Sequence, residues 1–233
     1  GAPPMATEEH LLGTDLQGRD ILSRVLYGAR VSLTVGVVAT GIGMTFGLMI
    51  GLLAGYYRGR IETSFNLIID TVLAMPGLVV LLLASVIFGG SLTIVSLSLG
   101  VLLIPPFARI SRANTLNFAQ REFVVAAKAM GARDLRIIVM EILPNVVLPV
   151  AAYALVLVAA AIVIEGSLSF LGLSVPSPTP SWGGMIAEGR ENLGDSPHVS
   201  FIPAAFMFLT VLSFNLVGDA LRSKLADLRE SAL

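Results

Sequence analysis

Long stretches without an ionisable side chain alternate with short clusters of charge along the chain. The uncharged stretches lie between Arg30 and Arg58, Asp70 and Arg109, Glu141 and Glu165, and Asp195 and Asp219. A helix needs about 20 apolar residues to cross the hydrocarbon core of a bilayer. The second stretch is long enough for two short spans, with Gly89-Gly90-Ser91 as the turn between them. The pattern therefore predicts five membrane-spanning helices, over residues 31–57, 67–88, 92–108, 145–164 and 201–218.

One further uncharged stretch, residues 166–187, is not predicted to span the membrane. Its prolines and glycines cannot form a continuous helix facing lipid, because the backbone groups that they free would have no partner there. We expect the segment 165–200 to be a long loop.

The composition supports an integral membrane protein. Hydrophobic residues make up 55% of the 233 residues, charged residues 13%, and the mean hydropathy is +0.85. Soluble domains carry about 25% charged residues. The net charge of −1 excludes a broad basic face for nucleic acid, and the chain has no cysteine. The predicted fold class is all-α, a polytopic bundle of transmembrane helices.

The distribution of positive charge predicts the orientation of these helices. Eleven of the fifteen Lys and Arg residues lie in one set of connections, namely Arg58, Arg60, Arg109, Arg112, Arg121, Lys128, Arg133, Arg136, Arg222, Lys224 and Arg229. Loops rich in Lys and Arg stay in the cytoplasm. We therefore expect the loop 109–144 and the tail 219–233 to be cytoplasmic, and the segment 1–30 and the loop 165–200 to be extracytoplasmic.

The N-terminal segment is predicted to contain a short amphipathic helix. Within residues 13–30, apolar Ile21, Leu22 and Val25 share one helical face and polar Arg19 and Arg24 oppose them. We expect this helix to lie on the outer membrane surface and to lead into the first span. The chain begins with Gly rather than Met, and a sixth, N-terminal span is expected to precede it.

The first span carries small residues at every fourth position. Gly43, Gly47, Gly51 and Gly55 fall on one face, where the missing side chains allow another backbone to approach closely. The stripe predicts a helix-packing surface. Its partner is either another helix of this chain or a second subunit.

The predicted cytoplasmic loop 109–144 is longer than a simple connection between neighbouring spans. Asn117 and Gln120 resemble a capping box that opens a helix with Phe123, Val124, Ala127 and Met130 on one face. Gly131 is expected to end this helix, and a second helix begins near Asp134 and runs to Pro144. Such an apolar stripe suits a groove on a soluble partner, or equally the inner leaflet of the membrane.

The run VAAKAMGARDLRIIVMEILP, residues 125–144, resembles the EAA signature of permeases from binding-protein-dependent ABC importers. The positions that match in register are Ala126, Ala127, Gly131, Leu143 and Pro144. Val125 stands where the signature has Glu, and Glu141 stands where it has Ile.

Four further segments resemble the dipeptide, oligopeptide and nickel branch of that family, in its DppC/OppC-like members. These segments are GTDLQGRDILSRVLYGARVSL from Gly13, EGSLSFLGL from Glu165, WGGMIAEGR from Trp182 and FNLVGDALR from Phe214. The resemblance extends from about Leu11 to Arg222.

The resemblance implies a type I ABC importer permease in the bacterial plasma (inner) membrane. Such a chain forms half of the translocation pathway for di- or oligopeptides. Its expected partners are a homologous second permease (DppB/OppB-like), two ATP-binding subunits or a fused pair, an extracytoplasmic substrate-binding protein and membrane lipid, but no nucleic acid. The EAA-like residues Ala126, Ala127, Gly131, Leu143 and Pro144 would then couple to the ATPase.

The chain itself is not expected to be an enzyme or to bind a cofactor. It contains no G-x-x-x-x-G-K-[ST] loop, so ATP and Mg are expected on partner subunits. No catalytic residue and no metal ligand set is predicted. Glu165, Trp182 and Arg190 of the outer loop are candidate gating or docking residues. Two alternatives remain open: a permease for nickel or a nickel chelate, and a self-sufficient secondary transporter.

Overall fold

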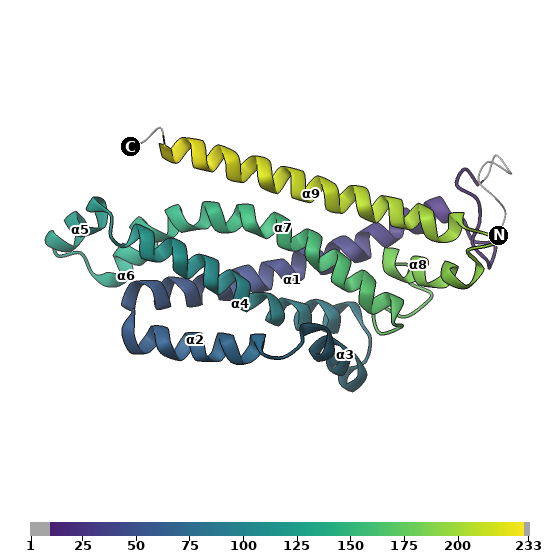
Figure 1. The fold of residues 1–233 in the computed structure, drawn as a ribbon, viewed down its shortest axis with the longest axis horizontal. Coiled ribbons are helices and arrows are strands. Elements are labelled where there is room, and N and C mark those ends of the chain that lie inside the picture. The colour runs from purple at the N-terminus through teal and green to yellow at the C-terminus, as the bar shows by residue number, and fades with distance from the viewer. Residues whose placement is uncertain (1–9, 231–233) are drawn as a thin grey trace. The chain divides into compact units, whose positions relative to one another are not determined.

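The structure is a computed structural model that describes residues 10–230, and the side chains of residues 10–225. Within residues 10–230 the chain is helical and contains no strand, only an isolated bridge between Thr14 and Asp20 (Figure 1). This confirms the predicted all-α class. The helices are α1 (Ile21–Tyr57), α2 (Gly59–Leu73), α3 (Gly77–Phe88), α4 (Leu92–Phe118), α5 (Glu122–Ala129), α6 (Asp134–Arg136), a π-helical segment (Ile137–Ile142), α7 (Leu143–Phe170), α8 (Trp182–Gly189), a 3-10 turn (Arg190–Asn192) and α9 (His198–Glu230).

Four stretches of the described chain are long and apolar enough to cross a membrane as single helices. They are α1, α4, the stretch from Asp134 to Phe170 that ends in α7, and α9. The pair α2 and α3 is long and apolar enough when taken together, but it is bent by 75°. Counting this pair as one broken span gives five, the number that the uncharged stretches predict.

The predicted continuous span over residues 67–88 is wrong. The chain instead forms α2 and α3, with a break around Pro76. Proline has no N–H for the helix, and its ring disfavours helical backbone at the preceding residue, Met75. A helix therefore ends before Pro76, and a second one starts after it in a new direction.

Other helix boundaries lie outside the predicted spans. Because α1 starts at Ile21, residues 21–30 continue directly into the first span and do not form a separate surface helix. Asp20 fixes this start, since its Oδ2 accepts from the backbone N of Ser23 at 2.8 Å. At the other end of the chain, α9 continues through much of the segment predicted as a tail, to Glu230. The first residues of the N-terminal segment and the last of the tail lie outside the described residues.

The chain folds into two compact units. Unit 1 comprises Gly1–Ala39, Leu78–Leu99 and Val158–Asn215, and unit 2 comprises Thr40–Gly77, Gly100–Leu157 and Leu216–Leu233. The division falls inside α1, α4, α7 and α9, so each of these helices contributes one part to each unit.

The core of unit 1 joins α1, α7, α8 and α9 through buried apolar side chains. Its buried members are Ile21, Val25, Val158, Ile162, Trp182, Met185 and Val199. Burial of such side chains against each other fixes α8, although α8 is only eight residues long.

In unit 2 the glycine stripe of α1 packs against α4 of the same chain. The four glycines Gly43, Gly47, Gly51 and Gly55 face, in order, Leu103, Phe107, Ser111 and Thr115, which are also four residues apart. A β-carbon added at Gly51 would lie 2.5 Å from the Cβ of Ser111, and one added at Gly43 would lie 2.6 Å from the Cβ of Leu103. The partner that the sequence leaves open is thus a helix of this chain.

This close packing is reinforced by polar contacts. Ser111 Oγ donates across the helix pair to the backbone oxygen of Leu48 at 3.2 Å. On another face of α4, Arg109 Nη2 pairs with Asp70 Oδ1 of α2 at 2.6 Å, and Arg112 pairs with Glu62 of α2. The packing of Gly51 and Gly55 against Ser111 and Thr115 continues beyond residue 108, and α4 extends to Phe118, ten residues beyond the predicted end of the span.

The glycine packing predicts that two Gly→Ala changes on α1 differ in their effect on stability. Gly51→Ala is expected to lower the stability of the folded protein by about 1–3 kcal/mol, because its methyl group overlaps α4. Gly41→Ala is the matched control, since a β-carbon there meets nothing within 4 Å. Resistance to unfolding in a denaturing detergent measures both. Equal stability of the two variants would contradict the packing.

Candidate functional site

The first candidate site is the short helix α5 and the turn that follows it, in unit 2. Met130 ends α5, and Gly131 adopts a φ of +80°. The N–H of Gly131 donates to the carbonyl of Lys128 and the N–H of Ala132 to that of Ala127, each at 3.0 Å. This pattern of two bonds is a Schellman motif, whose left-handed position favours glycine. Gly131 therefore ends the helix as the sequence predicts.

The start of α5 differs from the prediction. Asn117 is still within α4, and the N-cap of α5 is Arg121, whose backbone is extended. Within α5, Val124 and Ala127 are buried, whereas Val125 and Met130 are 57% and 82% exposed. The predicted exposed stripe of Phe123, Val124, Ala127 and Met130 is therefore wrong for its two middle members. The sequence period alone does not tell which side of so short a helix faces the protein.

The EAA-like residues occupy distinct positions around this turn. Ala126 and Gly131 are exposed, and Ala127 is buried. Leu143 and Pro144 begin α7, directly after the π-helical segment. Since Pro144 has no N–H to offer the preceding turn, a local change from the α-helical to the π-helical hydrogen-bond pattern is accommodated there.

Tyr56, at the end of α1, holds both sides of the turn. Its hydroxyl donates to Asp134 Oδ1 at 2.6 Å, and the ammonium of Lys128 lies 4.8 Å from the centre of its ring. One side chain thus contacts both α5 and α6. Sequence reasoning missed Tyr56, because nothing local distinguishes it from the neighbouring Tyr57.

The second candidate site is a buried carboxylate in unit 1. Glu165 lies within α7 rather than in the predicted loop 165–200, and it is 0% exposed. Three serine hydroxyls donate to it: Ser32 to Oε2 at 3.1 Å, and Ser169 and Ser174 to Oε1 at 2.7 and 2.9 Å. The serines come from α1, α7 and the segment after α7.

Trp182 lies beside this carboxylate, whereas Arg190 does not join it. The Trp182 side chain is buried and donates from Nε1 to the carbonyl of Val25 at 3.0 Å. Its backbone N donates to Ser32 Oγ, which in turn donates to Glu165. The guanidinium of Arg190 is exposed and lies 5.0 Å from the ring centre of Phe170. The structure thus brings together two of the three predicted residues.

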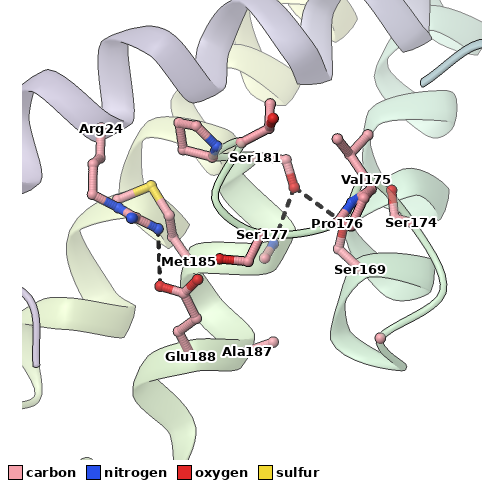
Figure 2. Close-up of a pocket in the computed structure, with 14 residues that line it drawn as sticks. Arg24, Ser169, Ser174, Val175, Pro176, Ser177, Ser181, Met185, Ala187 and Glu188 are labelled. Carbon is pink, nitrogen blue, oxygen red and sulfur yellow. Dashed lines mark hydrogen bonds and ion pairs between the residues drawn. The ribbon is translucent and has the colours of Figure 1, made fainter. Parts of the chain in front are cut away.

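A cavity of about 190 Å³ adjoins this site (Figure 2). Ser169 and Ser174 line one wall, and an ion pair between Arg24 Nη2 and Glu188 Oε2, 2.9 Å apart, lines the opposite one. Arg19 joins the same Glu188 oxygen at 2.9 Å. The sequence pattern places Arg24 on a solvent-facing side, but in the structure it is buried, because this acid of α8 and Asp15 neutralise it.

Asp15 anchors the turn that precedes α1. Burial by itself raises the pKa of Asp15, but hydrogen bonds from the backbone and side chain of Arg19 and from the backbone of Gln17 lower it overall. The Arg19 guanidinium also lies close enough to form an ion pair, with Nε 2.5 Å from Oδ2. The turn is therefore held in place by an ionised carboxylate.

Comparison with known proteins identifies the class to which this fold belongs. Residues 47–227 match the family described as the binding-protein-dependent transport system inner membrane component. The chain belongs to this family. It is a multi-pass permease of an ABC importer, and such a permease works with a partner permease, an ATPase and a binding protein. The family is one of transport permeases of ABC importers, which overturns the alternative of a self-sufficient secondary transporter.

Relatives with named transport functions indicate which branch of the family the chain resembles. The chain is 40% identical over 216 residues to the glutathione transport system permease protein GsiD of Pectobacterium atrosepticum, covering 93% of this chain and 72% of that protein. It is 42% identical over 217 residues to GsiD of Escherichia coli O157:H7, with the same coverage. These relatives confirm the predicted DppC/OppC-like branch.

Solved structures share the fold. One chain of the inward-facing MetNI methionine ABC transporter matches with a TM-score of 0.71 and 19% identity, covering 87% of this chain and 97% of that one. A chain of an amino acid ABC transporter with histidines matches with a TM-score of 0.60 and 20% identity, and the match covers 91% of this chain and 95% of that one. The helical architecture is that of ABC importer permeases.

The lowered pKa of Asp15 predicts a pH-dependent stability. Because the folded pKa lies below the ordinary value of 3.8, the carboxylate stabilises the fold fully above that value and ceases to do so as the pH falls through the folded pKa. Asp15→Asn is expected to cost about 1–2 kcal/mol at pH 7, and less as the pH falls below about 3.8. Thermal unfolding across this range measures the difference, with the exposed Glu191→Gln as control. A cost that does not change with pH would contradict the assignment.

Proposed function

We propose that this chain forms half of the translocation pathway of an ATP-driven importer for di- or oligopeptides delivered by an extracytoplasmic binding protein. The observation that carries the proposal is the identity of 40–42% to glutathione permeases over 93% of the chain. Glutathione is itself a small peptide, so a peptide cargo is the simplest class common to these relatives and to the predicted branch.

The turn around Gly131 is proposed as the surface that couples to the ATPase. Its exposed apolar side chains, Val125, Met130 and Leu135 (72%), suit a groove on a soluble partner. Tyr56 connects the turn to the end of α1. A displacement of α5 by the ATPase would therefore be transmitted to α1, which is a long apolar helix. ATP and Mg are bound by the partner subunits in this proposal.

The distribution of Lys and Arg supports an orientation of the chain in the membrane. The Lys and Arg residues gather in the connections around α5 and near the end of α9, which favours a cytoplasmic position for both. We infer that the C-terminus is cytoplasmic. Unit 1, with its buried Glu165 and the segment up to α9, then contains the extracytoplasmic connections. The loop with Trp182 and Arg190 is proposed to dock the binding protein or to gate the pathway.

Substitution of Gly131 tests the coupling surface. Gly131→Arg is expected to leave the protein in the membrane but to abolish co-purification of the ATPase, since a long charged side chain would project from the turn. Gly131→Asn is the matched control, because Asn tolerates positive φ and keeps the turn. Undiminished recovery of the ATPase with the Arg variant would refute this surface.

Transport in proteoliposomes tests the cargo. The importer reconstituted with its own binding protein is expected to take up a glutathione-like or other short peptide in an ATP-dependent manner. Uptake of Ni²⁺ or its chelate, with no peptide uptake, would contradict the peptide cargo and support the alternative of a nickel permease.

A further inference from the structure

The carboxylate of Glu165 is sealed inside unit 1 and accepts hydrogen bonds only from hydroxyl groups among the described side chains. It is 0% exposed, and three serine hydroxyls supply its two oxygens. A carboxylate can only accept hydrogen bonds, so this supply of donors matches its ionised form. A buried charge without such donors is strongly disfavoured.

Two hydrogen-bond chains connect this carboxylate to the first turn of α8. In the first, the backbone N of Trp182 donates to Ser32 Oγ at 3.3 Å, and Ser32 donates to Glu165 Oε2. Ser32 belongs to α1. This chain therefore joins three helices, α8, α1 and α7, through one hydroxyl group.

The second chain reaches the other carboxylate oxygen. The backbone N of Gly184 donates to Ser181 Oγ at 3.1 Å, and Ser181 lies 3.1 Å from Ser169 Oγ. Because Ser169 gives its hydrogen to Glu165, Ser181 is the donor to Ser169. Every hydrogen in this chain thus points toward Glu165, and bonds aligned in this way strengthen one another.

The backbone of α8 also lies directly against α7. A β-carbon added at Gly183 would come within 2.7 Å of the carbonyl oxygen of Gly166 and 2.8 Å of the Cβ of Ser169. The contact leaves no space for water between the two helices at this point. The first turn of α8 is therefore held both by packing and by the two chains.

We propose that Glu165 is a positioning residue that locks α8 to α1 and α7, so that these three segments move as one body during transport. Displacement of α8 would withdraw the Trp182 N–H from Ser32 and the Ser181 hydroxyl from Ser169, and so remove the donors that polarise these two serines toward the carboxylate. The inference rests on the proposed permease function for its role in transport. The lock itself concerns contacts within unit 1 and is measured there.

Distances between spin labels test the lock, and because residues 1–233 contain no cysteine, each label is attached to a cysteine introduced at the chosen position. One label replaces Leu26 of α1, which is 57% exposed, and the other replaces Glu191, which follows α8 and is 79% exposed. The full chain is measured with the subunits that accompany it from its native membrane, before and after addition of ATP and vanadate. With Glu165 intact, one narrow distance is expected in both states.

Glu165→Gln is the decisive variant. Its amide group donates where the carboxylate accepts, so that it opposes one of the two chains. We expect a second, broader distance, with the undocked population of α8 raised about tenfold or more. Asp195→Asn, which neutralises an exposed acid nearby, should keep the narrow distance. A narrow distance that is the same in Glu165→Gln as in the parent would overturn the lock.

A second label pair separates release of α8 from general loosening. Labels at Leu26 and at Val163, which is 42% exposed on α7, report on α1 and α7 alone and should stay narrow in Glu165→Gln. Broadening of both pairs would overturn the specific role of Glu165. If Glu165→Gln fails to fold, Ser32→Ala removes only the first chain and should broaden the α8 distance, and an unchanged distance would again overturn the lock.

The outcome is distinguishable from failure of the proposed function. Loss of the lock appears as a distance within unit 1, whatever the cargo or the energy source. Failure of the proposed function appears as intact ATPase recovery with Gly131→Arg, or as no ATP-dependent uptake, while the distance remains narrow.

Discussion

The approach of α1 to α4 is the constraint on which the rest of unit 2 depends. Four glycines at intervals of four residues remove every side chain from one face of α1, so that the two backbones meet. With α4 fixed in this way, Phe107 packs edge-on against Tyr153 of α7, with the two ring centres 5.7 Å apart. Arg109 and Arg112 of α4 form ion pairs with acidic side chains of α2. In lipid, where apolar surface alone does not drive helices together, such close packing is a main source of association.

Unit 1 illustrates a second rule of membrane proteins, that polar groups are satisfied within the chain. Arg24 is nearly buried because Asp15 and Glu188 lie beside it, and Glu165 is buried because serines surround it. These polar contacts come from segments far apart in sequence, as in the hydrogen bond between Ser32 and Glu165. Specificity of packing in this unit therefore rests on few, well-placed polar side chains within an apolar core.

Part of the coupling region could be predicted from local sequence. Gly131 ends α5 because the left-handed position of the turn favours glycine, and this requirement is visible in the sequence. The exposed face of α5 could not be predicted in the same way. Val124 and Ala127 are buried where α5 packs against the π-helical segment Ile137–Ile142, and Tyr56, which contacts Lys128 of α5, lies far from α5 in the sequence.

The sequence by itself determined the class of protein and the family, because uncharged length and short motifs are local properties. It also determined that one face of α1 would pack closely. Only the tertiary structure decided that α4 is the partner of that face, and that Glu165 and Trp182 share a site without Arg190. Such outcomes depend on which distant segments meet. The spacing of residues along one helix does not indicate which other helix will pack against it.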